Sequence, residues 1–105
     1  MQERHKNREQ YYKEQGITTA KYLIPYVERY IPITSESRIL EVGCGFAGNL
    51  SPFIERGCEV VGIDLGEHLI ELGKKFLAKN YPDANATLVC SDIYDTDAAT
   101  FGTFD

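Results

Sequence analysis

The sequence lacks the features of several protein classes. No apolar run approaches the roughly 20 residues that a membrane-spanning helix needs, and the opening stretch MQERHKNREQ contains nothing typical of a secretory signal. The net charge is −5 at pH 7, so there is no excess of basic residues of the kind that binds a phosphate backbone. We therefore expect a cytoplasmic protein without membrane contact, and nothing indicates a nucleic-acid partner.

Cysteine is also scarce. Cys44, Cys58 and Cys90 are the only three, and their spacing fits no metal site. We expect them to be small buried side chains in a reducing compartment, and we expect no metal ion. The remaining composition, 43% apolar and 26% charged in 105 residues, is that of one small globular domain.

Apolar residues recur at regular spacing along the chain. Residues 1–15 are polar and predict a frayed or helical arm, and residues 17–31 predict a helix that bends or restarts at Pro25. The apolar face of that helix is formed by Ile17, Ala20, Leu23, Ile24, Val27 and Ile31. Three strands then alternate with two helices, over 38–42, 48–57, 58–63, 66–81 and 86–91. Strands separated by helices predict right-handed crossovers and a parallel sheet covered on both faces.

A glycine-rich turn follows the first predicted strand. Gly43, Gly45 and Gly48 match G-x-G-x-x-G between that strand and the next helix. Glycines allow a sharp turn and a close approach to a ligand, and a helix N-terminus offers free N–H groups. Asp64 ends the second strand, where an acid can accept hydrogen bonds from ribose hydroxyls. The pattern predicts a nucleotide-type site, although Asp64 is also a candidate helix cap.

Glu41 lies two residues before this turn and decides between two ligands. A dinucleotide places its diphosphate over such a turn. At about 5 Å and an effective dielectric constant near 20, each like-charge pair would cost on the order of 3 kcal/mol. S-adenosylmethionine has no phosphate and carries a sulfonium and an α-ammonium group, so Glu41 would attract it. An NAD(P)-dependent oxidoreductase and a non-catalytic fragment stay open as alternatives, as does an ion pair of Glu41 with Arg38.

Three segments resemble the class I S-adenosylmethionine-dependent methyltransferases. ILEVGCGFAGNL is similar to the first motif of that family, VVGIDLGEHLIELGKK to the segment that follows it, and LVCSDIYD to the region of the third strand. The resemblance covers about residues 38–105, and the order and spacing of the segments make it fairly specific. It implies an α/β, Rossmann-like doubly wound parallel sheet, of which only the first three strands, in the order 3-2-1, and their helices are present.

The resemblance also implies a cofactor site. Gly43, Cys44 and Gly45 would pass beneath the methionine part with Glu41 nearby, and Asp64 would hold the ribose diol. Leu65 would lie against adenine, Asp92 would accept a hydrogen bond from the adenine amino group, and the backbone of Ile93 would address the ring edge. One departure concerns Ala47, where many members have glycine; alanine fits there if its φ is negative.

We expect a helical arm and leading helix over residues 1–37 and the cofactor-binding half of a methyltransferase domain over 38–105, truncated before the fourth strand. The implied function is methyl transfer to an unidentified small-molecule acceptor. In the family, the groups that bind the acceptor come mainly from the arm and from loops after the fourth and later strands. The sequence therefore predicts no catalytic residue and no oligomeric state, and we expect the 105 residues alone to be inactive. Tyr11 and Tyr12 are either packing residues or part of a lid.

Overall fold

A parallel three-stranded sheet forms the centre of the computed structural model, which describes residues 8–95 and 103–104. The strands are β1 (Arg38–Val42), β2 (Glu59–Asp64) and β3 (Ala86–Cys90), in the spatial order β1-β2-β3. Ile39 lies opposite Val60, and Val60 lies opposite Ala86. The predicted parallel sheet and strand order are confirmed, and the carboxyl ends of all three strands lie at one edge.

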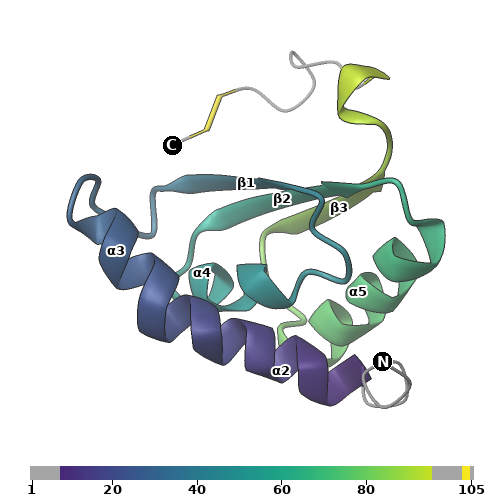
Figure 1. Ribbon diagram of the computed structural model, residues 1–105, viewed down its shortest axis with the longest axis horizontal. Helices are drawn as coiled ribbons and strands as arrows, with labels where there is room; N and C mark the ends of the chain where they lie inside the picture. Colours follow the sequence, from purple (N-terminus) through teal and green to yellow (C-terminus); the bar gives the residue numbers. More distant parts are fainter. Residues whose placement is uncertain (1–7, 96–102, 105) are drawn as a thin grey trace.

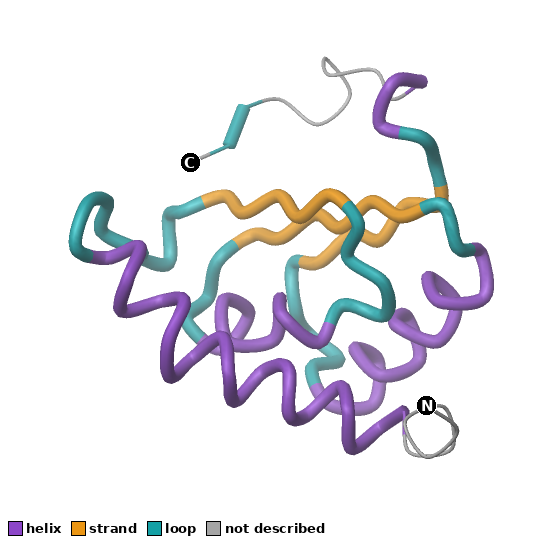
Figure 2. The backbone as a smooth tube through the Cα atoms, in the orientation of Figure 1, coloured by secondary structure: helices purple, strands orange, loops and turns teal. Residues whose placement is uncertain are grey.

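Apart from the short 3-10 helix at Ile93–Asp95, the helices lie on one face of this sheet (Figure 1). The helical elements are α2 (Arg8–Thr18), the π-helix η1 (Thr19–Leu23), α3 (Ile24–Glu28), the 3-10 helix η2 (Gly48–Leu50), α4 (Ser51–Glu55), α5 (Glu67–Asn80) and the 3-10 helix η3 (Ile93–Asp95). Both crossovers lead to the next strand in the same direction, so their helices fall on the same side. Figure 2 shows the resulting layer of strands above a layer of helices. The expected cover on both faces is therefore wrong for the described residues, and Leu40 and Val42 of β1 are 36% and 55% exposed.

The leading helix, which consists of α2, η1 and α3 in succession, changes its winding in the middle. In η1 the N–H of Ile24 donates to the carbonyl oxygen of Thr19, five residues earlier. Pro25, in the first turn of α3, has no N–H, and its ring crowds the preceding turn, so a wider turn relieves the clash. The predicted restart of the helix near Pro25 is confirmed.

The predicted apolar face of this helix is wrong except at Ile24, which is buried, and Val27, which is partly buried. Ile17 is 65% exposed and Leu23 is 47% exposed. The buried positions are Tyr12, Gly16, Thr19 and Ile24. The long step from Thr19 to Ile24 contains the extra residue of the π turn, which a pattern of regular helical spacing does not include. The helix therefore buries Thr19, a polar residue, in place of the apolar residues beside it.

Side chains of the helix layer pack together beneath the sheet. Tyr12 is 3% exposed and its ring lies 4.9 Å from that of Phe76, while Tyr11 meets Phe46 edge-on at 5.6 Å. Both tyrosines therefore pack against the core. The core cluster is completed by Ile24, Ile33, Cys44, Ala47, Leu50, Phe53, Ile54, Cys58, Val60, Ile70, Leu77 and Leu88.

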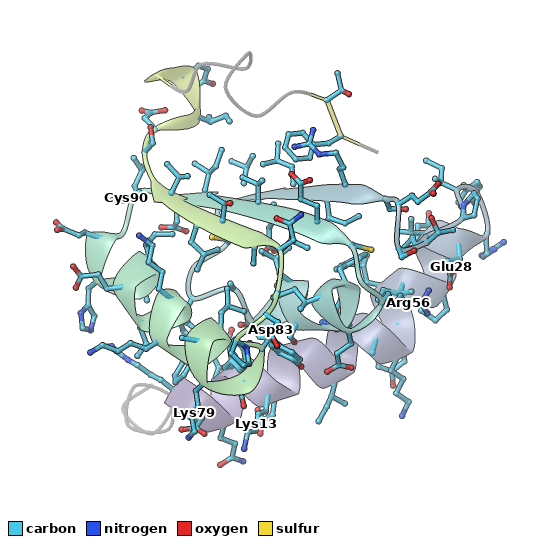
Figure 3. All side chains as sticks on the ribbon, turned by 180° about the vertical axis from the view of Figure 1, so that it is seen from behind. Lys13, Glu28, Arg56, Lys79, Asp83 and Cys90 are labelled. Carbon is cyan, nitrogen blue, oxygen red and sulfur yellow. The ribbon has the colours of Figure 1, made fainter. Side chains whose placement is uncertain are left out.

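Ion pairs hold the leading helix at both ends. Lys79 of α5 lies 2.9 Å from Glu9 of α2, and Arg56, after α4, lies 2.9 Å from Glu28 of α3 (Figure 3). Such exposed pairs contribute little stability, but they mark where the helix touches the rest of the domain. Cys90, also labelled in Figure 3, is exposed because it ends the edge strand β3, so the expectation that all three cysteines are buried is wrong for this one.

Candidate functional site

The turn after β1 is fixed against the end of β2. The N–H groups of Gly43 and Cys44 both donate to the carbonyl oxygen of Ile63, at 2.7 and 3.2 Å. The N–H of Gly45 donates to Oδ2 of Asp64 at 2.9 Å. Gly43 and Gly45 have φ angles of +76° and +58°, and a Cβ at either position would meet no heavy atom within 4 Å. The turn is thus rigid on its inner side and open on its outer side, where a ligand can approach the backbone.

Ala47 and Gly48, where the turn leads into η2, serve packing. Ala47 has a φ of +71° and is fully buried, so the condition named for alanine at this position, a negative φ, is not met. The left-handed conformation costs an alanine roughly 1–2 kcal/mol, and burial of its methyl group offsets part of that. Gly48 lies against α2, since a Cβ there would be 2.8 Å from the carbonyl oxygen of Tyr12. This close contact gives the third glycine a packing reason that requires no diphosphate.

Asp64 connects two loops at the end of β2. Its Oδ2 accepts from the N–H of Gly45, and its Oδ1 accepts from the N–H of Gly66 at 2.8 Å. Helix α5 begins at Glu67 with Gly66 as its N-cap and no side-chain cap, so Asp64 is not the cap of this helix. A carboxylate has about four acceptor positions, so both oxygens retain capacity for hydroxyl donors of a ligand.

Glu41 has one partnered and one unpartnered oxygen. Its Oε2 accepts from Nδ2 of Asn49 at 3.3 Å, whereas Oε1 is buried and has no hydrogen-bond partner among the described residues. Burial raises the pKa of Glu41, the Asn49 hydrogen bond lowers it, and the nearby charge of Asp64 raises it. Arg38 instead pairs with Glu59 at 2.7 Å, so the alternative of an Arg38–Glu41 pair is not found. An unpaired buried acceptor is costly, and a cationic donor from a ligand would satisfy it.

A hollow of about 360 Å³ opens at the carboxyl ends of the strands. Its lining consists of Val42, Gly43, Ile63, Asp64, Leu65, Ser91, Asp92, Ile93 and Tyr94. Leu65 is 72% and Ile93 is 40% exposed, so both present apolar surface to it. In open parallel sheets, ligands bind outside the carboxyl ends of the strands, and this hollow lies there.

Most of the residues predicted for the cofactor site meet here. Gly43, Asp64, Leu65, Asp92 and Ile93 line the hollow, and Gly45 adjoins it through its hydrogen bond to Asp64. Glu41, in β1, is close enough to Asp64 for the two charges to interact. The side chain of Cys44 points elsewhere: it is buried beneath the turn, where a Cβ on Gly62 would lie 2.7 Å from its sulfur. Only its backbone is thus available for the predicted role.

Two polar residues at the site were missed by the sequence analysis. Asn49 contacts Glu41 from η2, and Thr19 of η1 donates from Oγ1 to Oδ1 of Asn49 at 2.8 Å. Nothing in the local sequence marks Thr19, because the π turn places it there. Within residues 8–95 and 103–104, no cluster of His, Cys, Asp and Glu could hold a metal ion, and no helix is long and apolar enough to cross a membrane.

A family model described as a methyltransferase domain matches residues 39–105. The chain belongs to this methyltransferase domain family. The match includes the glycine turn, the three acids Glu41, Asp64 and Asp92, and the third strand. It begins one residue after the start of β1. The class I S-adenosylmethionine-dependent resemblance is thereby confirmed, and S-adenosylmethionine is the cofactor that this family implies.

Solved structures and a curated relative support this assignment. The methyltransferase domain is 34% identical to PKMT2 from Rickettsia typhi, solved in complex with AdoHcy, with a TM-score of 0.63 over 70% of this chain and 14% of that one. The magnesium protoporphyrin IX methyltransferase ChlM of Synechocystis, solved with bound SAH, shares the fold at 17% identity and a TM-score of 0.68, covering 89% of this chain and 40% of that one. A carboxy-S-adenosyl-L-methionine synthase of Shewanella loihica is 37% identical over 67 residues, which are 60% of this chain and 28% of that protein. The chain thus spans less than a third of the curated relatives it matches.

Replacing Glu41 with glutamine is expected to stabilise the ligand-free methyltransferase domain. Because the pKa of Glu41 is raised in the folded state, its stabilising contribution is present at low pH and lost as pH rises through that pKa. Glutamine keeps the acceptor for Asn49 without a buried charge. We expect urea unfolding to show a gain of roughly 0.5–2 kcal/mol near neutral pH, and little gain at about pH 4, where the carboxyl is protonated. An equal gain at both pH values would contradict the electrostatic origin.

Proposed function

We propose that this methyltransferase domain binds S-adenosylmethionine at the glycine turn and transfers its methyl group to a small-molecule acceptor. The observation that carries the proposal is Oε1 of Glu41, which is buried without a hydrogen-bond partner among the described residues, and Glu41 comes just before a turn whose outer side is open. A cation bound there would pair with Oε1, the carboxylate oxygen to which no described residue donates. A diphosphate in the same position would meet the negative charges of both Glu41 and Asp64.

The chain's own residues would divide the binding of the cofactor among them. Glu41 would accept from the α-ammonium group of the methionine part, which the open backbone of Gly43 and Gly45 would leave room for. Asp64 would accept from the ribose hydroxyls while it continues to hold the N–H of Gly45. These polar contacts fix one end of the ligand relative to β1 and β2.

The adenine end fits the hollow beside β3. Leu65 and Ile93 offer exposed apolar surface on which a flat ring can lie. Asp92 is held by the N–H of Tyr94, which donates to its Oδ1 at 2.9 Å. That bond orients the carboxylate, whose other acceptor positions suit the adenine amino group.

The contribution of the protein to the reaction is alignment. When bound, S-adenosylmethionine supplies an electrophilic methyl group on a sulfonium sulfur. Glu41 and Asp64 would hold the cofactor at the carboxyl edge of the sheet, so that its methyl group would be presented to an acceptor in a fixed orientation. Such positioning converts a bimolecular reaction into an effectively unimolecular one and accounts for several kcal/mol of the barrier.

A small molecule is the acceptor we propose. The neighbour ChlM is named for a porphyrin substrate, and a second neighbour of similar fold is a coclaurine N-methyltransferase. The net charge of −5 disfavours a nucleic-acid acceptor. A cytoplasmic location remains a prediction from the sequence.

Calorimetry on the full-length protein tests the cofactor. We expect one-to-one binding of S-adenosylmethionine and S-adenosylhomocysteine, and no measurable binding of NAD. Glu71→Gln, which removes an exposed acid from α5, is the matched control for Glu41→Gln. Only the Glu41 variant is expected to weaken binding. Binding of NAD in the absence of binding of either sulfur ligand would favour the oxidoreductase alternative and refute the proposal.

A further inference from the structure

A chain of two hydrogen bonds leads from the leading helix to the cofactor site. Oγ1 of Thr19 donates to Oδ1 of Asn49 at 2.8 Å, and Nδ2 of Asn49 donates to Oε2 of Glu41 at 3.3 Å. The three residues belong to η1, η2 and β1, so they come from three separate elements. The chain of hydrogen bonds ends at the carboxylate of Glu41, whose other oxygen has no partner within the part of the chain that the structure describes.

The direction of these bonds follows from the chemistry of the groups. An ionised carboxylate can only accept, so Asn49 must present its NH₂ group to Glu41. The amide oxygen of Asn49 then faces Thr19, whose hydroxyl must donate. The hydroxyl of Thr19 donates to that oxygen and so stabilises the amide orientation that supports a charged Glu41. An apolar side chain at position 19 would remove that stabilisation.

We propose that Thr19 and Asn49 are positioning residues that hold Glu41 charged and oriented for the cofactor. This inference rests on the proposed function, because it assigns the free oxygen of Glu41 to a cationic group of S-adenosylmethionine. It makes the leading helix part of the cofactor site, although the helix contributes no residue to the hollow.

The packing of the leading helix brings Thr19 into reach. Two glycines allow α2 to approach η2 and α4 closely. A Cβ on Gly48 of η2 would lie 2.8 Å from the carbonyl oxygen of Tyr12 in α2, and a Cβ on Gly16 of α2 would lie 2.6 Å from Oγ of Ser51 in α4. Thr19 begins the π turn, and such turns often occur at functional sites. Thr19 is 3% exposed, so its hydroxyl is committed to Asn49 and not to water.

The groups that face Glu41 make this support necessary. Among the described residues, Asp64 on β2 and Cys44 in the turn are the titratable groups that interact with Glu41. The hydrogen bond from Asn49 acts on the pKa of Glu41 in the direction opposite to the charge of Asp64. Burial and the charge of Asp64 raise the pKa of Glu41, while the Asn49 bond lowers it. Loss of that bond should therefore raise the pKa further. Cofactor binding that needs the charged form would then weaken most at low pH.

The test is the pH dependence of S-adenosylhomocysteine affinity, measured by calorimetry on the full-length protein between about pH 5.5 and 8.5. Thr19→Val and Asn49→Leu remove the two bonds with little change of volume. We expect Asn49→Leu to bind about tenfold more weakly near pH 6, with a smaller loss near pH 8.5. Thr19→Val should show the same pH trend with a smaller loss. Thr19→Ser, which restores the hydroxyl, should bind within about twofold of wild type.

Controls separate positioning from folding. Thr18→Val, at an exposed neighbouring position, should leave the pH profile unchanged. A loss of affinity that is equal at all pH values in Thr19→Val and Asn49→Leu, or that Thr19→Ser does not reverse, would overturn the positioning role. If Asn49→Leu fails to fold, Thr19→Val against Thr19→Ser decides the question. Failure of wild type to bind S-adenosylhomocysteine would instead refute the proposed function.

Discussion

The Asp64→Ala variant is expected to bind S-adenosylhomocysteine roughly 10- to 100-fold more weakly than wild type. The substitution removes a charged acceptor for the ribose hydroxyls. It also leaves the N–H groups of Gly45 and Gly66 without the oxygens that hold them at 2.9 and 2.8 Å. The glycine turn thereby loses its side-chain attachment to β2 and part of its preorganisation. Calorimetry on the full-length protein measures the effect.

Two further variants isolate the cause of this loss. Asp64→Asn keeps one acceptor oxygen without the charge, so we expect an affinity between those of wild type and Asp64→Ala. Asp83→Ala removes an exposed acid in the turn before β3, at the opposite end of that strand from the hollow, and should not change the affinity. Unchanged affinity in Asp64→Ala would contradict the proposed ribose contact.

Gly48→Ala is expected to have the largest effect on stability, a loss of about 2–3 kcal/mol in the free energy of unfolding. Its Cβ would lie 2.8 Å from the backbone carbonyl oxygen of Tyr12 and would clash with Oε1 of Gln15. The glutamine can move, but the carbonyl belongs to α2, so the whole helix would have to shift. Urea denaturation measures the loss.

Gly43→Ala is the matched comparison, because the same methyl group meets open space there. Its cost to stability is the left-handed conformation alone, about 1–2 kcal/mol. The new side chain would stand on the open side of the turn, so cofactor affinity should fall more than in Gly48→Ala when each is compared at equal folded fraction. The assignment of Gly43 to the ligand and Gly48 to packing is wrong if Gly43→Ala is the less stable variant and Gly48→Ala the weaker binder.

Much of the fold followed from local patterns. Short apolar segments bounded by turns predicted all three strands to within one residue at each end, and the helices between them required parallel order. The end of α4 at Glu55, just before Gly57, also agrees with the sequence signal for a helix stop. These features depend on neighbours a few residues apart.

The candidate site was predictable where a residue follows directly from the end of a strand. Asp64 ends β2, Asp92 comes two residues after β3 and Gly43 directly follows β1, so parallel order alone brings them to one edge. Asn49 was not predicted, because its partner Glu41 lies on another element. The φ of Ala47 was also missed, since the sign of a backbone angle depends on how the turn is packed.

By itself, the sequence determined the order of the elements, the parallel sheet and the acids and glycines at its carboxyl edge, because these arise from short-range spacing. Only the tertiary structure decided that Gly48 faces the leading helix, that Arg38 pairs with Glu59, and that Glu41 keeps one buried oxygen without a partner. It also decided that Thr19 points at Asn49, since a π turn changes which side of a helix a residue occupies. Contacts between segments depend on the packing of whole elements against one another, and no local pattern encodes that packing.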